Sequence, residues 1–230
     1  MSNRKLEGIT GCVFDAYGTL FDFNSAVGHC RDILEEKADS LSKMWREKQL
    51  QYTWLLSLMG RHKDFWQVTG DALDYAMRSL GIHDEALKGR LMSLYRSLDA
   101  FPEVPATLER LRSAGLKTAI LSNGSPEMLL SAVKGTGIDH LLDAVLSVEE
   151  AGIYKPHPSV YKIAVNSLSL APQAICFVSA NAWDAHGASA FGMKVAWCNR
   201  YGQGQENLPG DPDVEVSTLA EIPGVLGIQG

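Results

Sequence analysis

Asp15 is well placed to do chemistry, because it directly follows a short apolar segment and precedes a small, flexible turn. Residues 12–14 predict the end of a buried strand. Ligands bind at the carboxyl ends of strands in open α/β sheets, so a carboxylate there would face a cleft. Gly18 would let the backbone approach a ligand, and Thr19 would hold one carboxylate oxygen while the other attacks. The alternative is a solvated aspartate at an ordinary turn.

A second polar segment, residues 121–126, follows an apolar run and leads into an expected helix. Free backbone N–H groups at a helix N-terminus attract anions, and the Ser122 hydroxyl adds a donor. The segment therefore predicts a site for a phosphate or a carboxylate. The alternative is that Ser-Asn-Gly-Ser-Pro serves only as a loop and helix cap.

Lys155 is held between an expected strand end and Pro156, so it is placed more tightly than an ordinary surface lysine. An ammonium close to Asp15 would keep that carboxylate ionised. The alternative is a solvated lysine. Tyr161, one turn into the next helix, either points its hydroxyl at Lys155 or packs in the core.

A fourth polar segment carries Ser179, Asn181 and Asp184 after another apolar run. A turn from a strand into a helix would let all three side chains face the same cleft. Asp184 has an alternative role as the N-cap of the helix that follows.

The elements that position these residues follow two patterns. From residue 24 to about residue 99 the chain reads as helical, with apolar residues at i, i+3 and i+4 and with Ser40 as a helix N-cap. Beyond residue 100, expected helices alternate with strands. Helices are expected at about 40–59, 64–80, 84–98, 106–114, 126–134, 159–168 and 184–191, and strands at 117–121, 144–147, 175–178, 194–197 and 214–216.

This alternation predicts βαβ units and a parallel sheet. The fold class expected is α/β, with a Rossmann-like parallel-sheet core and an inserted helical cap domain. The core would comprise residues 1–22 and 100–230, and the cap residues 23–99. A cleft between two domains is a common place for a small-molecule site.

Composition excludes several classes of partner. The net charge of −6 gives no electrostatic case for nucleic acid or an anionic membrane. No stretch approaches the roughly 20 apolar residues of a spanning helix, and the N-terminus lacks an apolar segment typical of a signal peptide. The cysteines show no disulfide or metal spacing, which suits the cytoplasm. They are Cys12, Cys30, Cys176 and Cys198.

The segment Asp-x-Tyr-Gly-Thr-Leu at residues 15–20 resembles the nucleophile loop of the haloacid dehalogenase superfamily. The anion loop, the lysine and the acidic turn follow in the superfamily's order, so the similarity covers nearly the whole chain. Tyr17 and the cap segment 44–54 are similar to those of the L-2-haloacid dehalogenases (type II) in particular. Phosphatases of the superfamily carry a second aspartate where this chain has Tyr17, and an acidic metal-binding loop where it has Asn181.

The resemblance implies hydrolytic dehalogenation of short L-2-haloalkanoic acids to D-2-hydroxy acids. Asp15 would form an ester with inversion of configuration, and water would then hydrolyse that ester. A halide leaves without a general acid and a haloacid carries one negative charge, so no metal and no cofactor are expected.

The resemblance also implies a role for each site residue. Arg46 would reach from the cap to the departing halide, which requires Glu47 beside it to turn outward. Asp184 would help to activate water, and Tyr161 would support Lys155. The substrate carboxylate would be held by Ser122 and the N–H groups of Ala16, Tyr17 and Asn123, the halogen pocket completed by Tyr17, Phe65, Asn181 and Trp183, and Asp15 oriented by Thr19, Lys155, Ser179 and Asp184.

The expected partner is a small haloacid, and the family and an aromatic cap helix with Trp45, Tyr52 and Trp54 suggest a homodimer. Three alternatives stay open. They are a metal-dependent small-molecule phosphatase of the same superfamily, a hydrolase of another activated small acid, and a non-catalytic small-acid-binding relic. Because Asp15 and Lys155 are both present, the relic is disfavoured.

Overall fold

Six short strands, all parallel, form one sheet within residues 5–229, the part of the chain that the computed structural model describes. The strand order is β3-β2-β1-β4-β5-β6, so the chain moves outward on one side of β1 before it returns on the other. Such a reversal of strand order opens a crevice at the carboxyl ends of the strands. The bounds are Gly11–Phe14 (β1), Lys117–Ser122 (β2), Ala144–Ser147 (β3), Ile175–Ser179 (β4), Lys194–Cys198 (β5) and Val214–Val216 (β6).

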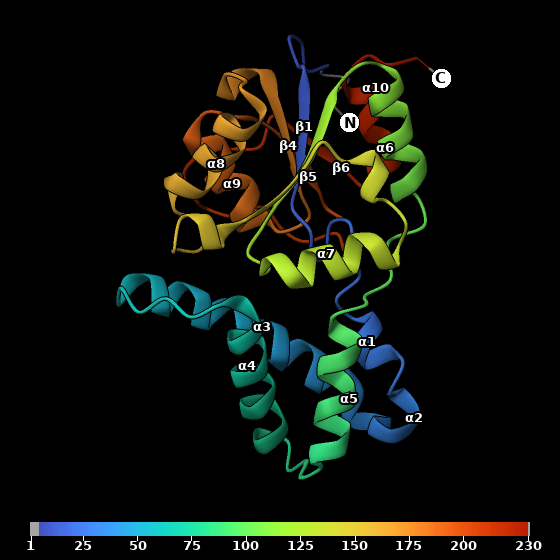
Figure 1. The fold of residues 1–230 in the computed structure, drawn as a ribbon, viewed down its shortest axis with the longest axis vertical. Helices are drawn as coiled ribbons and strands as arrows, with labels where there is room; N and C mark the ends of the chain where they lie inside the picture. Colours follow the sequence, from blue (N-terminus) through green and yellow to red (C-terminus); the bar gives the residue numbers. More distant parts are fainter. Residues whose placement is uncertain (1–4, 230) are drawn as a thin grey trace.

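Helices cover both faces of this sheet, with α8 and α9 on one side and α6 and α10 on the other (Figure 1). Every residue of β1 and β4 is buried, as expected for parallel strands covered on two faces. The predicted α/β class with a parallel-sheet core is confirmed. The core helices are α6 (Val104–Ser113), α7 (Pro126–Gly135), α8 (Pro158–Leu168), α9 (Ala182–Phe191) and α10 (Ile222–Val225), with the short 3-10 helices η2 (Asp139–Leu141), η3 (Val148–Glu150), η4 (Pro172–Ala174) and η5 (Leu219–Glu221).

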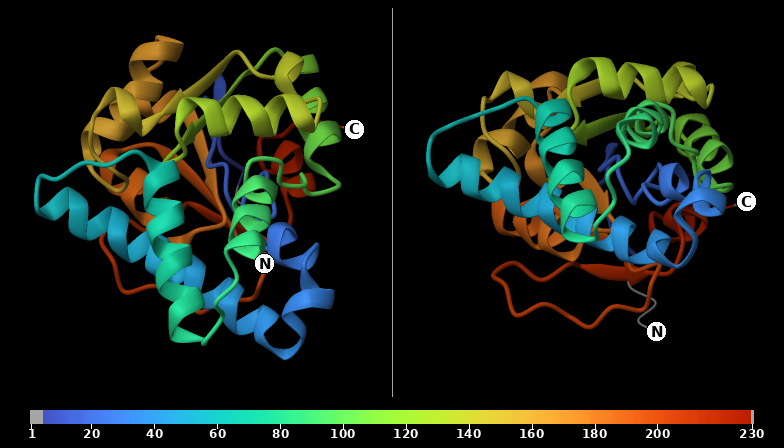
Figure 2. Two further views of the ribbon diagram at one scale, coloured as in Figure 1. Left: turned by 60° about the horizontal axis from the view of Figure 1, so that its bottom comes forward. Right: turned by 90° about the horizontal axis from the view of Figure 1, so that it is seen from below.

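A group of helices is inserted between β1 and β2 and lies below the carboxyl ends of the strands in Figure 1. The end of α3 extends beyond α4, as Figure 2 shows from two further sides. The domain boundaries at residues 22–23 and 99–100 stay a prediction. The two crossing segments lie side by side, because Asp22 N donates a hydrogen bond to Asp99 O at 2.8 Å. The inserted helices are α1 (Ser25–Gly28), α2 (Arg31–Leu34), η1 (Glu35–Lys37), α3 (Ala38–Leu58), α4 (Phe65–Ser79) and α5 (Glu85–Tyr95).

Most predicted elements agree with the structure to within three residues, but the predicted N-cap at Ser40 is wrong. α3 begins at Ala38 directly after η1, so Ser40 is an exposed residue of its first turn. Asp64 and Asp84 do cap α4 and α5, because their side chains accept hydrogen bonds from Gln67 N and Leu87 N. No helix within residues 5–229 is long and apolar enough to cross a membrane.

Candidate active site

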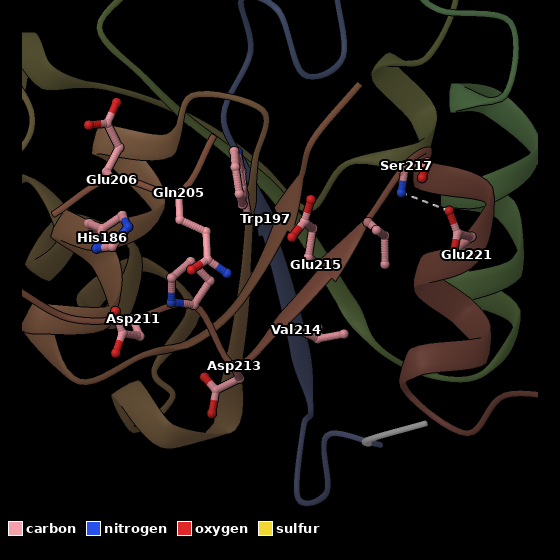
Figure 3. Close-up of a pocket in the computed structure, with 12 residues that line it drawn as sticks. His186, Trp197, Gln205, Glu206, Asp211, Asp213, Val214, Glu215, Ser217 and Glu221 are labelled. Carbon is pink, nitrogen blue, oxygen red and sulfur yellow. Dashed lines mark hydrogen bonds between the residues drawn. The ribbon is translucent and has the colours of Figure 1, made fainter. Parts of the chain in front are cut away.

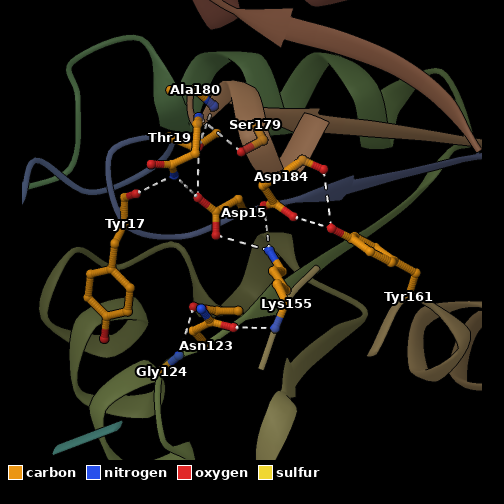
Figure 4. A network of polar contacts seen from close by, with 12 residues as sticks. Asp15, Tyr17, Thr19, Asn123, Gly124, Lys155, Tyr161, Ser179, Ala180 and Asp184 are labelled. Atoms are coloured by element: carbon orange, nitrogen blue, oxygen red, sulfur yellow. Dashed lines mark hydrogen bonds and ion pairs between the residues drawn. The ribbon is translucent and has the colours of Figure 1, made fainter. Parts of the chain in front are cut away.

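Asp15 lies at the centre of a polar network at the carboxyl ends of the central strands (Figure 4). It directly follows β1, and only 6% of its surface is exposed. Its Oδ2 accepts hydrogen bonds from Thr19 Oγ1 at 3.2 Å and from Asn181 Nδ2 at 2.7 Å. Its Oδ1 lies 3.1 Å from Lys155 Nζ, its one partner within residues 5–229. One carboxylate oxygen is therefore held by two neutral donors, and the other keeps a lone pair for an atom in the cleft.

The turn after Asp15 holds Thr19 in place. Gly18 has a φ of +89°, and a Cβ on it would approach Phe23 to 3.2 Å, so the turn favours glycine. Thr19 is fully buried, and its hydroxyl donates to Asp15 while it accepts from Ala180 N at 2.8 Å. The hydroxyl therefore connects the loop after β1 to the loop after β4.

Lys155 is a buried cation between two carboxylates. It is 1% exposed, and its Nζ lies 2.7 Å from Asp184 Oδ2 as well as 3.1 Å from Asp15 Oδ1. Its backbone N–H donates to Asn123 Oδ1 at 3.1 Å, which ties it to the loop after β2. Burial lowers the pKa of the Lys155 ammonium, but the charges of Asp15 and Asp184 more than offset this effect, so its pKa lies above the ordinary value. Lys155 is therefore charged at neutral pH.

Asp184 is the third residue of α9 and is fully buried. Its Oδ1 accepts from the Tyr161 hydroxyl at 2.8 Å, so Tyr161 contacts Asp184 directly and supports Lys155 only through it. Burial raises the pKa of Asp184 to about 6, and the nearby charge of Asp15 adds to this effect while Lys155 opposes it. A carboxylate with such a pKa can exchange a proton near neutral pH.

The loops after β1 and β2 contain backbone N–H groups that have no acceptor among the described residues. Within the described residues, the backbone N–H groups of Ala16, Tyr17 and Asn123 donate to no protein group. Ser122 Oγ accepts from Gly124 N at 3.0 Å, which leaves the Ser122 hydroxyl proton free to donate. A cluster of donors beside a lysine suits a small anion. The residues predicted to hold a carboxylate thus lie in an environment that favours one.

Arg46 reaches from α3 to the core. Its Nη2 lies 3.2 Å from Asn181 Oδ1 and 3.4 Å from Tyr17 O, and both acceptors belong to residues next to Asp15 in space or in sequence. Glu47 points away from the site: its side chain is 64% exposed and lies 4.0 Å from Lys43 Nζ. The guanidinium is thus the charged group that this part of α3 presents to the site.

Aromatic rings line the side of the site that faces the inserted helices. Tyr17 lies 5.7 Å from Phe65 and 5.6 Å from Tyr95 between ring centroids. Trp183, also predicted for this pocket, packs its ring edge-on against Trp54 of α3 at 5.5 Å. The structure therefore brings Tyr17 and Phe65 together and places Trp183 at a second contact between α9 and α3.

Ser179, predicted to orient Asp15, contacts the turn that follows it. Its Oγ accepts from Asn181 N at 3.1 Å, and Asn181 in turn donates its side-chain amide to Asp15. The Asn181 side chain is fully used, because its Oδ1 accepts from Arg46. Among residues 5–229, no three His, Cys, Asp or Glu side chains are grouped so as to hold a metal ion.

Two participants, Gln49 and Tyr95, were missed by the sequence reasoning. Gln49 is 1% exposed and accepts from Arg46 Nη1 at 2.8 Å, and Tyr95 Oη lies 3.1 Å from Gln49 Nε2. A signal for Gln49 did exist, because it falls four residues after Trp45 and three before Tyr52, on the apolar side of the helix. Tyr95 offered no comparable signal.

A separate hollow lies away from these residues. A groove of about 590 Å³ runs along β6 and the loop before it, lined by His186, Trp197, Asp211 and Glu215 among others (Figure 3). None of the predicted site residues lines it. This groove is therefore separate from the polar network around Asp15.

Comparison with known proteins gives consistent results. The family model for haloacid dehalogenase-like hydrolases matches residues 9–192. (S)-2-haloacid dehalogenase 1 of Pseudomonas sp. (strain CBS-3) is 46% identical over 96% of this chain and 98% of its own length. (S)-2-haloacid dehalogenase 4A of Burkholderia cepacia is 44% identical over 94% of each chain. The structure of L-2-haloacid dehalogenase from Xanthobacter autotrophicus with covalently bound chloropropionic acid is 34% identical, with a TM-score of 0.89 over 96% of this chain and 100% of that one.

Proposed function

The chain belongs to the haloacid dehalogenase-like hydrolase family, and from this premise we propose that it hydrolyses short L-2-haloalkanoic acids to D-2-hydroxy acids. The observation that carries the proposal is the position of Arg46. A guanidinium from α3 lies within 3.4 Å of Tyr17 O and within 3.2 Å of Asn181 Oδ1, beside the Asp15 carboxylate. A nucleophile faced by a cation suits the displacement of an anionic leaving group.

The first step forms an ester on Asp15. A carboxylate oxygen attacks the α-carbon from the side opposite the halogen, and the carbon–halogen bond breaks with its electron pair leaving as halide. The substrate carboxylate is held by Ser122 and the free N–H groups of Ala16, Tyr17 and Asn123. Arg46 stabilises the negative charge that develops on the halogen. The configuration at the α-carbon inverts.

The second step hydrolyses the ester. Water attacks the ester carbonyl carbon, and Asp184 takes its proton. Collapse of the tetrahedral intermediate breaks the bond from that carbon to the substrate oxygen, which takes the proton from Asp184 and leaves as the hydroxy acid. Asp15 loses the other water proton to solvent and is restored as a carboxylate. Covalent catalysis of this kind replaces one hard displacement with two easier steps.

The second step is expected to lower kcat at acidic pH. Asp184 must be ionised to take a proton, and its pKa is raised to about 6. We expect kcat to fall about tenfold per pH unit below that value and to level off above it, with the Asp15 ester accumulating at low pH. Steady-state rates across the range, with mass spectrometry of acid-quenched enzyme, measure both effects. A constant kcat through about one unit below the Asp184 pKa would rule out Asp184 as the base.

The phosphatase alternative is less well supported. Where a superfamily phosphatase carries its general acid, this chain has Tyr17, and burial holds the pKa of the Tyr17 hydroxyl well above its ordinary value. The Asn181 side chain is committed to Asp15 and Arg46. A non-catalytic relic is also disfavoured, because Asp15 and Lys155 form an intact buried pair.

Racemic 2-chloropropionate in excess EDTA tests the proposal directly. Chloride release is expected to stop at half conversion, leaving the D-substrate and forming D-lactate, because one enantiomer presents its back face to Asp15. Chiral chromatography of the remaining and newly formed acids measures this outcome. Absence of chloride release together with Mg²⁺-dependent phosphate release from an aryl phosphate would replace the proposal with the phosphatase.

We also propose a homodimer. Trp45 is buried inside the inserted helices and offers no free surface, and the half-buried Trp54 packs on Trp183. Among the described residues, the most exposed large apolar side chains are those of Leu58 and Met59 at the end of α3, which are 85% and 61% exposed. All four cysteines are free and buried, which supports the cytoplasm as the compartment.

A further inference from the structure

Gln49 lies inside the inserted helices, three residues after Arg46 on α3, and is 1% exposed. A buried side-chain amide needs partners for both its oxygen and its nitrogen. Gln49 Oε1 accepts from Arg46 Nη1 at 2.8 Å, and Gln49 Nε2 donates to Thr69 Oγ1 at 2.7 Å. The amide therefore connects the guanidinium on α3 to a hydroxyl on α4.

The orientation of this amide is fixed by Thr69. The Thr69 hydroxyl donates its one proton to Phe65 O at 2.6 Å, so toward Gln49 it can only accept. Gln49 must then present its nitrogen to Thr69 and its oxygen to Arg46. A flipped amide would set two donors against each other at the arginine.

The guanidinium is held without losing its charge. Gln49 occupies Nη1 of Arg46, and Nη2 remains directed at Asn181 Oδ1 and Tyr17 O beside Asp15. A neutral carbonyl oxygen anchors the group, whereas a carboxylate at the same place would pair with it and cancel the positive field. A preorganised cation is worth more to a transition state than a mobile one.

We propose that Gln49, oriented by Thr69, is a positioning residue that sets the direction of Arg46 toward the leaving halide. The chain of hydrogen bonds also couples Arg46 to Phe65, because Thr69 binds the Phe65 carbonyl one turn earlier on α4. Arg46 on α3 and Phe65 on α4, both expected around the halogen, are thus connected by the same hydrogen bonds through Gln49 and Thr69. This inference rests on the proposed function, since it assigns Gln49 a part in halide departure.

The test compares chloride and bromide release in a single turnover with enzyme in excess. Chloride is the poorer leaving group, so its departure depends more on a well-placed cation. In Gln49→Met, which keeps the length of the side chain without its polar atoms, chloride release is expected to slow by about 10- to 100-fold. Bromide release is expected to slow several-fold less. The ratio of the two rates comes from one preparation, so loss of folded protein cancels.

Gln51→Met is the matched control, because Gln51 lies exposed on the same helix and pairs with Lys48 at 2.6 Å. It is expected to keep the wild-type ratio. Thr69→Val should shift the ratio in the same direction as Gln49→Met and by less, since Tyr95 Oη still binds the amide. An unchanged ratio in Gln49→Met, beside an active wild type, would overturn the role of Gln49 alone. A wild type that releases neither halide would overturn the proposed function and this inference with it.

Discussion

Asp15→Asn is expected to abolish halide release, with a loss of at least about 10⁴-fold in kcat. An amide has no anionic oxygen to attack the α-carbon, and no other carboxylate is free to replace it. Asp184 is the nearest candidate, but its two oxygens are bound to Lys155 and Tyr161. The fold should persist at some cost in stability. An amide oxygen can still accept from Lys155 Nζ, which lies 3.1 Å from Asp15 Oδ1, but the amide nitrogen would face the donors Thr19 and Asn181.

The measurement is halide release over days, together with mass spectrometry of the quenched enzyme. Wild-type enzyme in a single turnover in water labelled with heavy oxygen should carry the label on Asp15, because water attacks the ester carbonyl carbon. Asp22→Asn is the control, since Asp22 lies on the same loop and, within residues 5–229, its side chain accepts only from Asn24 N. Undiminished release by Asp15→Asn, or label found only in the product hydroxyl, would remove Asp15 as the nucleophile.

The sheet and its site were predictable because both depend on short-range patterns. Each chemical residue follows an apolar run, and parallel strands bring their carboxyl ends to one edge. Asp15, Ser122 and Ser179 therefore had to lie close together once βαβ units were inferred. The place of Lys155 close to Asp15 was predicted in the same way, because Lys155 lies between an expected strand end and Pro156.

The contacts made by helical side chains were less predictable, because they depend on how helices pack against one another. The sequence placed Tyr161 one turn into a helix and left open whether its hydroxyl points at Lys155 or the side chain packs in the core, whereas in the structure the hydroxyl donates to Asp184. Trp183 was expected beside the halogen, and the structure shows its contact with Trp54, on a helix far away in sequence. Gln49 stood on an apolar helix face and was overlooked, because its partners Arg46 and Thr69 come from two helices.

Helix starts show the same limit on a smaller scale. Asp64 and Asp84 each lie directly before a helix that follows a non-helical segment. Their side chains accept hydrogen bonds from free N–H groups in the first turn of that helix. Ser40 has equal intrinsic preference for a cap, yet the chain is already wound at residues 35–37. The preceding turn, which local composition does not reveal, decided where α3 begins.

Lys155→Met should both inactivate the protein and destabilise it strongly. The ammonium lies between Asp15 and Asp184, and all three side chains are nearly or fully buried. Removing one partner of a buried ion pair costs about 3–5 kcal/mol of unfolding free energy, because the other charge stays buried and unpaired. Here two carboxylates would be left facing each other, and the substrate carboxylate would lose a nearby cation as well.

The pH dependence of this destabilisation separates electrostatics from lost packing. In the folded wild type the pKa of Asp184 is about 6, against 3.8 as its ordinary value. Without Lys155, which lowers it, the folded pKa must rise further above the unfolded one. A group with a raised folded pKa binds more protons in the folded state, so protonation restores stability as pH falls through that pKa. The deficit of Lys155→Met relative to wild type should therefore shrink between about pH 8 and pH 5.

Urea unfolding at both ends of that range measures the deficit, and Lys162→Met, an exposed lysine on α8, is the matched control. The control should stay within about 0.5 kcal/mol of wild type at either pH. A deficit of the same size at both pH values would mean that Lys155 stabilises the core by filling space. A deficit that shrinks on acidification, with activity still absent, would instead assign the lysine to holding two carboxylates ionised at the point where the ester forms and is hydrolysed.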